Sequence, residues 1–168
     1  MSDLRVHKTK YINETKRVSF KYDGKNYFGY EGDTLASALL ANGVHLIGRS
    51  FKYHRPRGIM SCGSEEPNAI CQISDKNDLT EPNVRATELE IFDGLEAFSQ
   101  NCWPNVKFDI GGINNLISPL IPAGFYYKTF MWPKSFWKKV YEPLIRMSAG
   151  LGKSPTEPDP DIYDHKYV

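Results

Sequence analysis

A two-stranded hairpin near the start of the chain constrains the fold more than any other feature. Apolar and polar residues alternate through residues 18–22 (VSFKY), as in a strand that buries one face. Asp23-Gly24 follows, a dipeptide that favours the tight turns of β-hairpins, and aromatic residues then continue at alternate positions as far as Tyr30. Residues 34–42 carry apolar residues at helical spacing. We therefore predict a hairpin that leads directly into a helix.

The predicted helix has a signal at each end. Asp33 precedes it and has a side chain that can accept hydrogen bonds from the first helical turn, so we predict Asp33 as the N-cap. Gly43 follows the last apolar residue and suits a left-handed C-terminal cap. Further strands are predicted at residues 69–73 (AICQI) and 86–92 (ATELEIF), where apolar and polar residues alternate again. The pattern indicates a small α+β unit.

The chain divides into four segments by pattern and composition. Eight of its 22 aromatic residues fall between Phe125 and Tyr141, a density that favours a buried contact with another domain or subunit over a satellite core of this chain. Helices are expected near residues 113–120 and 135–149, the latter kinked by Pro143. We expect an N-terminal arm (1–16), an α+β domain (17–93), an aromatic-rich helical and irregular extension (94–153), and a proline-rich linker toward a following domain (154–168).

The overall charge excludes a strongly cationic binding protein. The 168 residues carry 21 basic and 20 acidic side chains, a formal net charge of +1. We therefore expect neither nucleic acid nor a membrane surface as a partner. No apolar run approaches the ~20 residues that span a bilayer, and the N-terminus lacks an apolar signal core, so we expect a cytoplasmic protein.

One basic loop, residues 48–58 (GRSFKYHRPRG), is the candidate binding site. Guanidinium and ammonium groups suit phosphate or carboxylate, and the interleaved Phe51 and Tyr53 could stack on a planar ring. A phosphate-bearing cofactor, an acidic partner surface and a merely solvated loop all fit this pattern. The candidate residues are Arg49, Lys52, His54, Arg55 and Arg57.

No residue pattern in the chain points to catalysis or to a metal site. The three cysteines, Cys62, Cys71 and Cys102, show no Cys-x-x-Cys spacing, and the four histidines are scattered. Glu65 and Glu66 are adjacent, so an extended backbone would point them to opposite faces. We expect no catalytic residue and no metal ligand in this chain.

Five sequence runs together carry a family resemblance: residues 32–43 (GDTLASALLANG), 48–58 (GRSFKYHRPRG), 65–69 (EEPNA), 81–87 (EPNVRAT) and 122–132 (PAGFYYKTFMW). They resemble the N-terminal region of the alpha subunit of heterotetrameric sarcosine oxidase. The resemblance implies a β-grasp domain of the 2Fe-2S ferredoxin type, in agreement with the hairpin and helix above.

The cysteines depart from the pattern of related subunits that carry a two-iron cluster. Those subunits resemble ferredoxins, in which three ligands follow Cys-x₄-Cys-x₂-Cys and a fourth is distant. Counted from Cys62, the next two ligand positions are Pro67 and Ile70, and Cys71 comes one residue late. Three thiols also cannot supply four ligands. We expect a β-grasp scaffold without a cluster.

The resemblance also implies the setting of this chain. It implies a complex of alpha, beta, gamma and delta subunits that demethylates sarcosine to glycine with FAD, FMN, NAD and tetrahydrofolate, and that forms hydrogen peroxide. This chain would bind none of them alone, and its basic loop would contact the FMN phosphate or a subunit interface. Two alternatives remain: a stand-alone β-grasp module for a protein or an anionic ligand, and part of a related amine or proline-type dehydrogenase.

Overall fold

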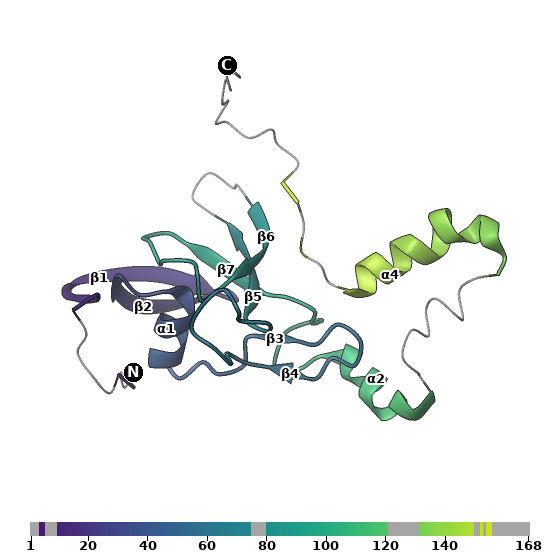
Figure 1. The fold of residues 1–168 in the computed structure, drawn as a ribbon, viewed down its shortest axis with the longest axis horizontal. Helices are drawn as coiled ribbons and strands as arrows, with labels where there is room; N and C mark the ends of the chain where they lie inside the picture. The colour runs from purple at the N-terminus through teal and green to yellow at the C-terminus, as the bar shows by residue number, and fades with distance from the viewer. Residues whose placement is uncertain are drawn as a thin grey trace, which may run out of the picture.

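A five-stranded mixed sheet in the order β2-β1-β7-β5-β6 forms the centre of the molecule (Figure 1). β1 and β7 are parallel, whereas all other neighbours are antiparallel. The computed structural model describes residues 4–5, 10–74, 80–120, 132–149, 152 and 154–155. The predicted α+β, β-grasp class is confirmed. The strands are β1 (Asn13–Tyr22), β2 (Lys25–Glu31), β5 (Ile70–Ser74), β6 (Thr80–Arg85) and β7 (Glu96–Ser99), with β3 (Gly48–Arg49) and β4 (Pro56–Arg57) forming a separate hairpin.

The structure confirms the hairpin predicted at Asp23-Gly24. Tyr22 pairs with Lys25, and the two turn residues have φ angles of 47° and 74°. Two successive positive φ values are characteristic of a type I′ turn, whose twist matches that of the flanking strands. The apolar residues of β1 are buried and the polar ones exposed, so one face of this strand lies in the core.

Strand β2 places its aromatic residues on both faces. Tyr27 is buried in the core. Phe28 and Tyr30 lie on the other face, where guanidinium groups cover them: that of Arg17 is 3.8 Å from the centroid of Phe28 and that of Arg5 is 5.1 Å from the centroid of Tyr30. Cation–π contacts therefore shield the outer aromatics of the hairpin.

Helix α1 (Leu35–Ala41) confirms the predicted helix and corrects its N-cap. The cap is Thr34, whose Oγ1 accepts a hydrogen bond of 3.2 Å from the backbone N–H of Ser37. Asp33 lies one residue earlier and is fully buried, and its carboxylate accepts the Ser37 hydroxyl instead. The buried residues of the helix are Leu35, Ala36, Ala38, Leu39 and Ala41.

The C-terminal end of α1 is a Schellman motif, as the position of Gly43 predicts. Gly43 has a φ of 75°, and its N–H donates to the Leu40 carbonyl at 2.9 Å. The N–H of Val44 donates to the Leu39 carbonyl, also at 2.9 Å. These two bonds satisfy carbonyls that the helix end leaves free.

Residues 86–92 are not the strand that their alternation predicts. β6 ends at Arg85, and the segment after it passes the start of α1. The carbonyls of Ala86 and Leu89 accept the N–H groups of Ala36 and Leu35, both at 2.8 Å. These N–H groups lie in the first turn of α1, where they have no partner within the helix. Ala86, Leu89 and Ile91 therefore face the helix and the core without pairing as a strand, whereas Phe92 is exposed.

Pro82 fits β6 because β6 is an edge strand. Asn83 beside it has a φ of 61°, close to an irregularity in the pairing of β5 with β6.

The sheet runs past residue 93, where the sequence suggests that the domain ends, since β7 lies centrally between β1 and β5. At the other end, β1 starts at Asn13, within the expected arm, and the Leu4 N–H donates to the Ala41 carbonyl at 2.9 Å.

The segments after β7 are short helices and irregular chain. Pro143 is the second residue of α4, which continues directly from the π-helix η4; the last bond of η4 runs from the Glu142 N–H to the Trp137 carbonyl. Most of the aromatic run, residues 121–131, lies outside the described residues. No helix in the described ranges is long and apolar enough to span a membrane. The helical elements are η1 (Ile110–Gly112), α2 (Ile113–Leu116), η2 (Ser118–Leu120), η3 (Lys134–Phe136), the π-helix η4 (Trp137–Tyr141) and α4 (Glu142–Ala149).

Candidate functional site

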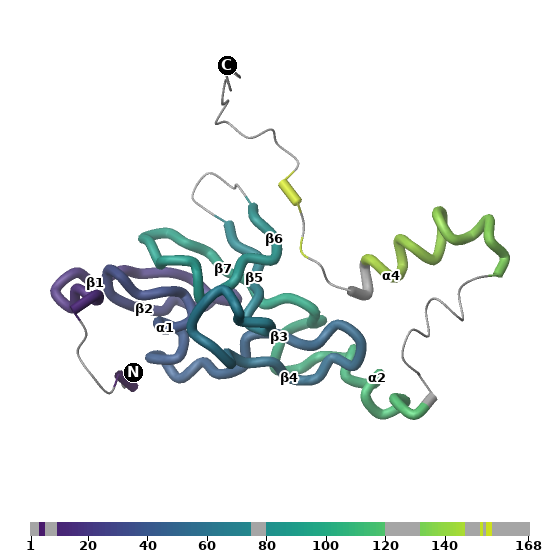
Figure 2. The backbone as a smooth tube through the Cα atoms, viewed as in Figure 1, coloured from purple at the N-terminus to yellow at the C-terminus, as the bar shows by residue number. Residues whose placement is uncertain are grey.

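The predicted basic loop is the β3–β4 hairpin, and it lies against the segment that contains α2 (Figure 2). Asn114 donates its side-chain amide to the Lys52 carbonyl at 3.3 Å, and Arg55 Nε donates to Asn115 Oδ1 at 3.0 Å. The two segments are separated by more than 50 residues in sequence, so tertiary contacts hold the hairpin in place.

Arg49 and His54 act as internal anchors of this hairpin. Arg49 Nε donates to the Val106 carbonyl at 2.8 Å, and its other guanidinium nitrogens reach the carbonyls of His54 and Lys107, both at 3.3 Å. His54 Nδ1 is 2.7 Å from Oδ2 of Asp109, whose side chain is fully buried. These two predicted binding residues therefore have partners within the chain.

Gly111 leaves the space that the His54 ring fills. A Cβ added at Gly111 would lie 2.3 Å from the ring of His54. Asp109 Oδ1 meanwhile accepts the backbone N–H groups of Trp103 and Gly111 at 2.9 and 3.1 Å. The carboxylate thus joins the hairpin to the turn that begins η1.

Lys52, Arg55 and Arg57 are the predicted residues that remain near solvent. The Lys52 ammonium and the Arg55 guanidinium lie 4.7 and 4.8 Å from the centroid of the Tyr53 ring. Arg57 is exposed on β4. Two cations beside one aromatic ring, those of Lys52 and Arg55, suit an anionic group at this end of the hairpin.

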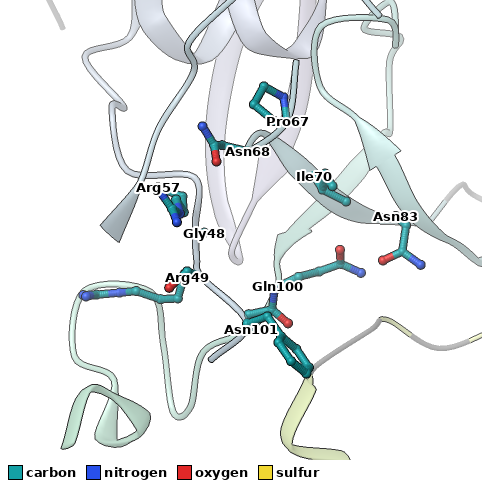
Figure 3. Close-up of a pocket in the computed structure, with 11 residues that line it drawn as sticks. Gly48, Arg49, Arg57, Pro67, Asn68, Ile70, Asn83, Gln100 and Asn101 are labelled. Carbon is teal, nitrogen blue, oxygen red and sulfur yellow. The ribbon is translucent and has the colours of Figure 1, made fainter. Parts of the chain in front are cut away.

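A pocket of about 300 Å³ opens beside the hairpin (Figure 3). Gln100 is only 7% exposed, and in the described part of the chain its Nε2 has no hydrogen-bond partner. Its amide extends toward Asn83 in Figure 3. The lining includes the amide residues Asn68, Asn83, Gln100 and Asn101, the apolar residues Phe51, Pro67 and Ile70, and Arg57. Sequence reasoning missed the amides because they come from separate segments without a shared motif.

The three thiols do not fit a two-iron cluster. Cys62 is exposed, whereas Cys71 is fully buried in β5, where burial raises the pKa of its thiol to about 12. Cys102 Sγ is 3.3 Å from the hydroxyl of Ser99, and burial raises the pKa of this thiol as well. A cluster needs four thiolates that converge on one point. The described residues contain no group of three or more His, Cys, Asp or Glu side chains placed to hold a metal.

Comparison with known proteins identifies relatives that are much longer than this chain. The chain is 55% identical over 168 residues to the sarcosine oxidase subunit alpha of Rhizobium meliloti (strain 1021). The alignment covers all of this chain and 17% of that protein. It is 41% identical over 88 residues to the sarcosine oxidase subunit alpha of Corynebacterium sp. (strain U-96), which covers 51% of this chain and 9% of that protein. The resemblance expected from the sequence is confirmed, and the chain spans less than a fifth of the length of these relatives.

The structure is also similar to a solved protein and to a domain family. L-proline dehydrogenase from P. horikoshii aligns with a TM-score of 0.41 and 26% identity over 51% of this chain and 16% of that one. The family described as 2Fe-2S iron-sulfur cluster binding domain matches residues 15–102, which include the whole sheet except the start of β1. The chain therefore belongs to the family of 2Fe-2S iron-sulfur cluster binding domains, although its own thiols do not form a ligand set for a cluster.

Proposed function

We propose that this chain is a noncatalytic scaffold portion of a sarcosine oxidase alpha subunit. The observation that carries the proposal is the 55% identity over all 168 residues to the Rhizobium meliloti subunit. In this proposal the β-grasp unit runs through Ser99, the helical extension follows, and residues 154–168 lead toward a dinucleotide-binding domain. The complex oxidatively demethylates sarcosine to glycine, transfers the one-carbon unit to tetrahydrofolate and forms hydrogen peroxide.

The proposal extends to the cofactors and partners of the complex. FAD, FMN, NAD and tetrahydrofolate belong to the assembly, and this chain alone holds none of them. Its partners are the rest of the alpha subunit and the beta, gamma and delta subunits, in a cytoplasmic complex. The chain contributes the surface of a folded domain.

Within this assembly, we assign the exposed end of the β3–β4 hairpin to an anionic contact, either the FMN phosphate or an acidic subunit surface. Lys52, Arg55 and Arg57 supply the charge. Arg49 and His54 have a positioning role, because their side chains bond to the 103–109 segment of the same chain. The hairpin is therefore held rigidly before it meets its partner.

Co-expression of this chain, within its alpha subunit, with the beta, gamma and delta subunits tests the proposal. We expect a purified complex with flavin absorbance and sarcosine-dependent peroxide formation. Arg57→Glu should reduce FMN content or subunit assembly, whereas Lys25→Glu, an exposed change in the β1–β2 hairpin, should not. A complex that oxidises proline and not sarcosine would favour the proline-type dehydrogenase. Full FMN content and assembly in Arg57→Glu would refute the role of the hairpin.

The pocket supports a second candidate, a binding module for a small anionic ligand. The supporting observation is the buried Gln100 amide without a described partner, in a pocket that Arg57 also lines. Calorimetric titration with inorganic phosphate tests this candidate. Saturable binding that Arg57→Glu and Gln100→Leu both abolish would support it, and absence of binding would reject a phosphate module.

A further inference from the structure

The loop between β4 and β5 folds around one buried carboxylate, that of Glu66. Glu66 is only 1% exposed. Its Oε2 accepts the backbone N–H groups of Met60 and Ser61 at 2.7 and 2.6 Å. Its Oε1 accepts those of Asn68 and Ala69 at 2.8 and 3.2 Å. Four amides, two from each side of the loop, thus converge on a single anion.

These hydrogen bonds stabilise the charged form of Glu66 although the side chain is buried. Burial alone would raise the pKa of Glu66, but the four backbone hydrogen bonds oppose it and hold the pKa below its usual value. The hydrogen-bond partners found for both oxygens in the described chain are backbone amides. Backbone amides that converge on an anion also hold phosphates and iron–sulfur centres.

The four amides that bind Glu66 lie in the segment that would carry a cluster. Counted from Cys62, the three consecutive ligands of a ferredoxin-type site fall at Cys62, Pro67 and Ile70. The four donor amides lie beside these positions in sequence, at residues 60, 61, 68 and 69. A cluster held by four thiolates is itself an anion, and hydrogen bonds to its sulfurs are part of such sites.

We propose that the Glu66 carboxylate takes the place of the cluster as the anion around which this loop folds. The loop then keeps its closed shape without iron. Two contacts connect it to the core: Thr87 Oγ1 donates to the Gly63 carbonyl at 2.9 Å, and the Ala86 N–H donates to the Ala69 carbonyl at 2.8 Å. The order of the loop depends on a carboxylate that acid can protonate, and it does not depend on iron or sulfide.

Hydrogen exchange of the intact chain, followed by mass spectrometry of a peptide spanning residues 58–70, tests this inference. In Glu66→Gln we expect the amides of this peptide to exchange about tenfold faster or more, because charge-assisted hydrogen bonds are lost. Glu65→Gln is the matched control, since it removes the same charge from the exposed neighbouring residue and should leave exchange unchanged. Equal protection in Glu66→Gln and the native chain would overturn the proposal.

Two measurements on the unsubstituted chain keep the test decisive if Glu66→Gln does not fold. First, protection of the peptide, corrected for intrinsic rates, should be complete above pH 4.5, the ordinary pKa, decline as the pH falls below that value and be lost below the lowered pKa. A peptide from β1–β2 reports global unfolding separately. Second, anaerobic incubation with ferrous iron, sulfide and a thiol should leave the chain without cluster absorbance. Incorporation of two irons per chain would overturn the proposal.

Discussion

At the scale of single residues, buried carboxylates organise this domain. Asp33 is fully buried and accepts hydrogen bonds from Arg5, from the Ser37 hydroxyl at 2.8 Å and from the Tyr30 N–H at 2.9 Å. Arg5 binds both of its oxygens, so the start of the chain is joined to the helix and to β2 through one side chain. The Asp109 carboxylate likewise joins His54 of the basic hairpin to the turn before η1. The Glu66 carboxylate joins the two sides of the β4–β5 loop.

We predict that Asp33→Ala lowers the free energy of unfolding by about 3–5 kcal/mol, because the substitution leaves Arg5 without its partner in the buried Arg5–Asp33 ion pair. Urea denaturation of the intact chain measures the change. Glu31→Gln is the control, since Glu31 pairs with Lys16 on an exposed edge and such pairs contribute little. A similar loss in both variants would contradict the central role of Asp33.

The three thiols should differ in reactivity as their burial differs. Alkylation of the native chain at pH 8 should modify Cys62 first, Cys102 slowly and Cys71 only after unfolding. Cys71 stays a neutral thiol at that pH because burial raises its pKa to about 12, and the thiolate is the reacting species. Peptide mass spectrometry identifies the modified residues, and early modification of Cys71 would show that β5 is accessible.

At the scale of secondary-structure elements, local sequence signals and tertiary contacts together determine where α1 begins and ends. The C-terminal end of α1 is a local motif, since Gly43 supplies the left-handed residue that its hydrogen bonds require. The N-terminal end combines the Thr34 cap with carbonyls from residues 86 and 89. Only the first of these two ends follows fully from neighbouring residues.

We expect Gly43→Ala to destabilise the chain by about 1–2 kcal/mol, the cost of a left-handed conformation for a residue with a Cβ. Space is not the cause, because the nearest atom to an added Cβ is 3.7 Å away. Gly112→Ala is the matched control: Gly112 has a φ of −58° and open space around it. Thermal unfolding compares the two variants, and equal stability would argue against the cap.

Docking of the β3–β4 hairpin should depend on Gly111. An alanine there would place a methyl group on the His54 ring, so Gly111→Ala should separate the hairpin from the α2 segment. Hydrogen exchange should increase at residues 48–58 and 103–112 and stay unchanged in the β1–β2 hairpin. Exchange that is unaltered in all three regions would refute this role for His54.

At the scale of the whole molecule, many large apolar side chains are exposed outside the core. Several large ones in the segments after β7 are exposed, among them Trp103 at 67%, Leu116 at 80% and Trp132 at 84%. Monomeric proteins rarely expose many such residues together. Because the chain spans 17% of its Rhizobium meliloti relative, the rest of an alpha subunit is the partner that we propose for them.

This proposal predicts different behaviour for the chain alone and in its complex. Alone, the chain should bind a hydrophobic dye such as ANS and show the tryptophan emission of water-exposed rings. Assembly with the remaining subunits should abolish dye binding and shift the emission to shorter wavelength. Trp103→Ser should weaken assembly without changing the stability of the sheet, because Trp103 lies outside the buried core. Unchanged dye binding in the complex would contradict the prediction.

The sequence alone was sufficient for the elements whose signals are local. The hairpin at Asp23-Gly24, the buried face of β1 and the helix just before Gly43 each depend on neighbouring residues, and all three are confirmed. The basic residues of the hairpin were also visible in the sequence. Their division into anchors and exposed cations was not, because the partners of Arg49 and His54 lie more than 50 residues away.

Tertiary structure alone decided where distant segments meet. Alternation in residues 86–92 is typical of a strand, but this segment packs against the start of α1, and the consecutive residues Ala86 and Thr87 are both buried. β7 is central because it pairs both with β1, from the start of the domain, and with β5. The sequence predicted only that the adjacent residues Glu65 and Glu66 point to opposite faces. In the fold, Glu65 is exposed, whereas Glu66 is buried and accepts hydrogen bonds from four backbone amides. Burial and hydrogen bonding between remote residues, which no local pattern encodes, made that difference.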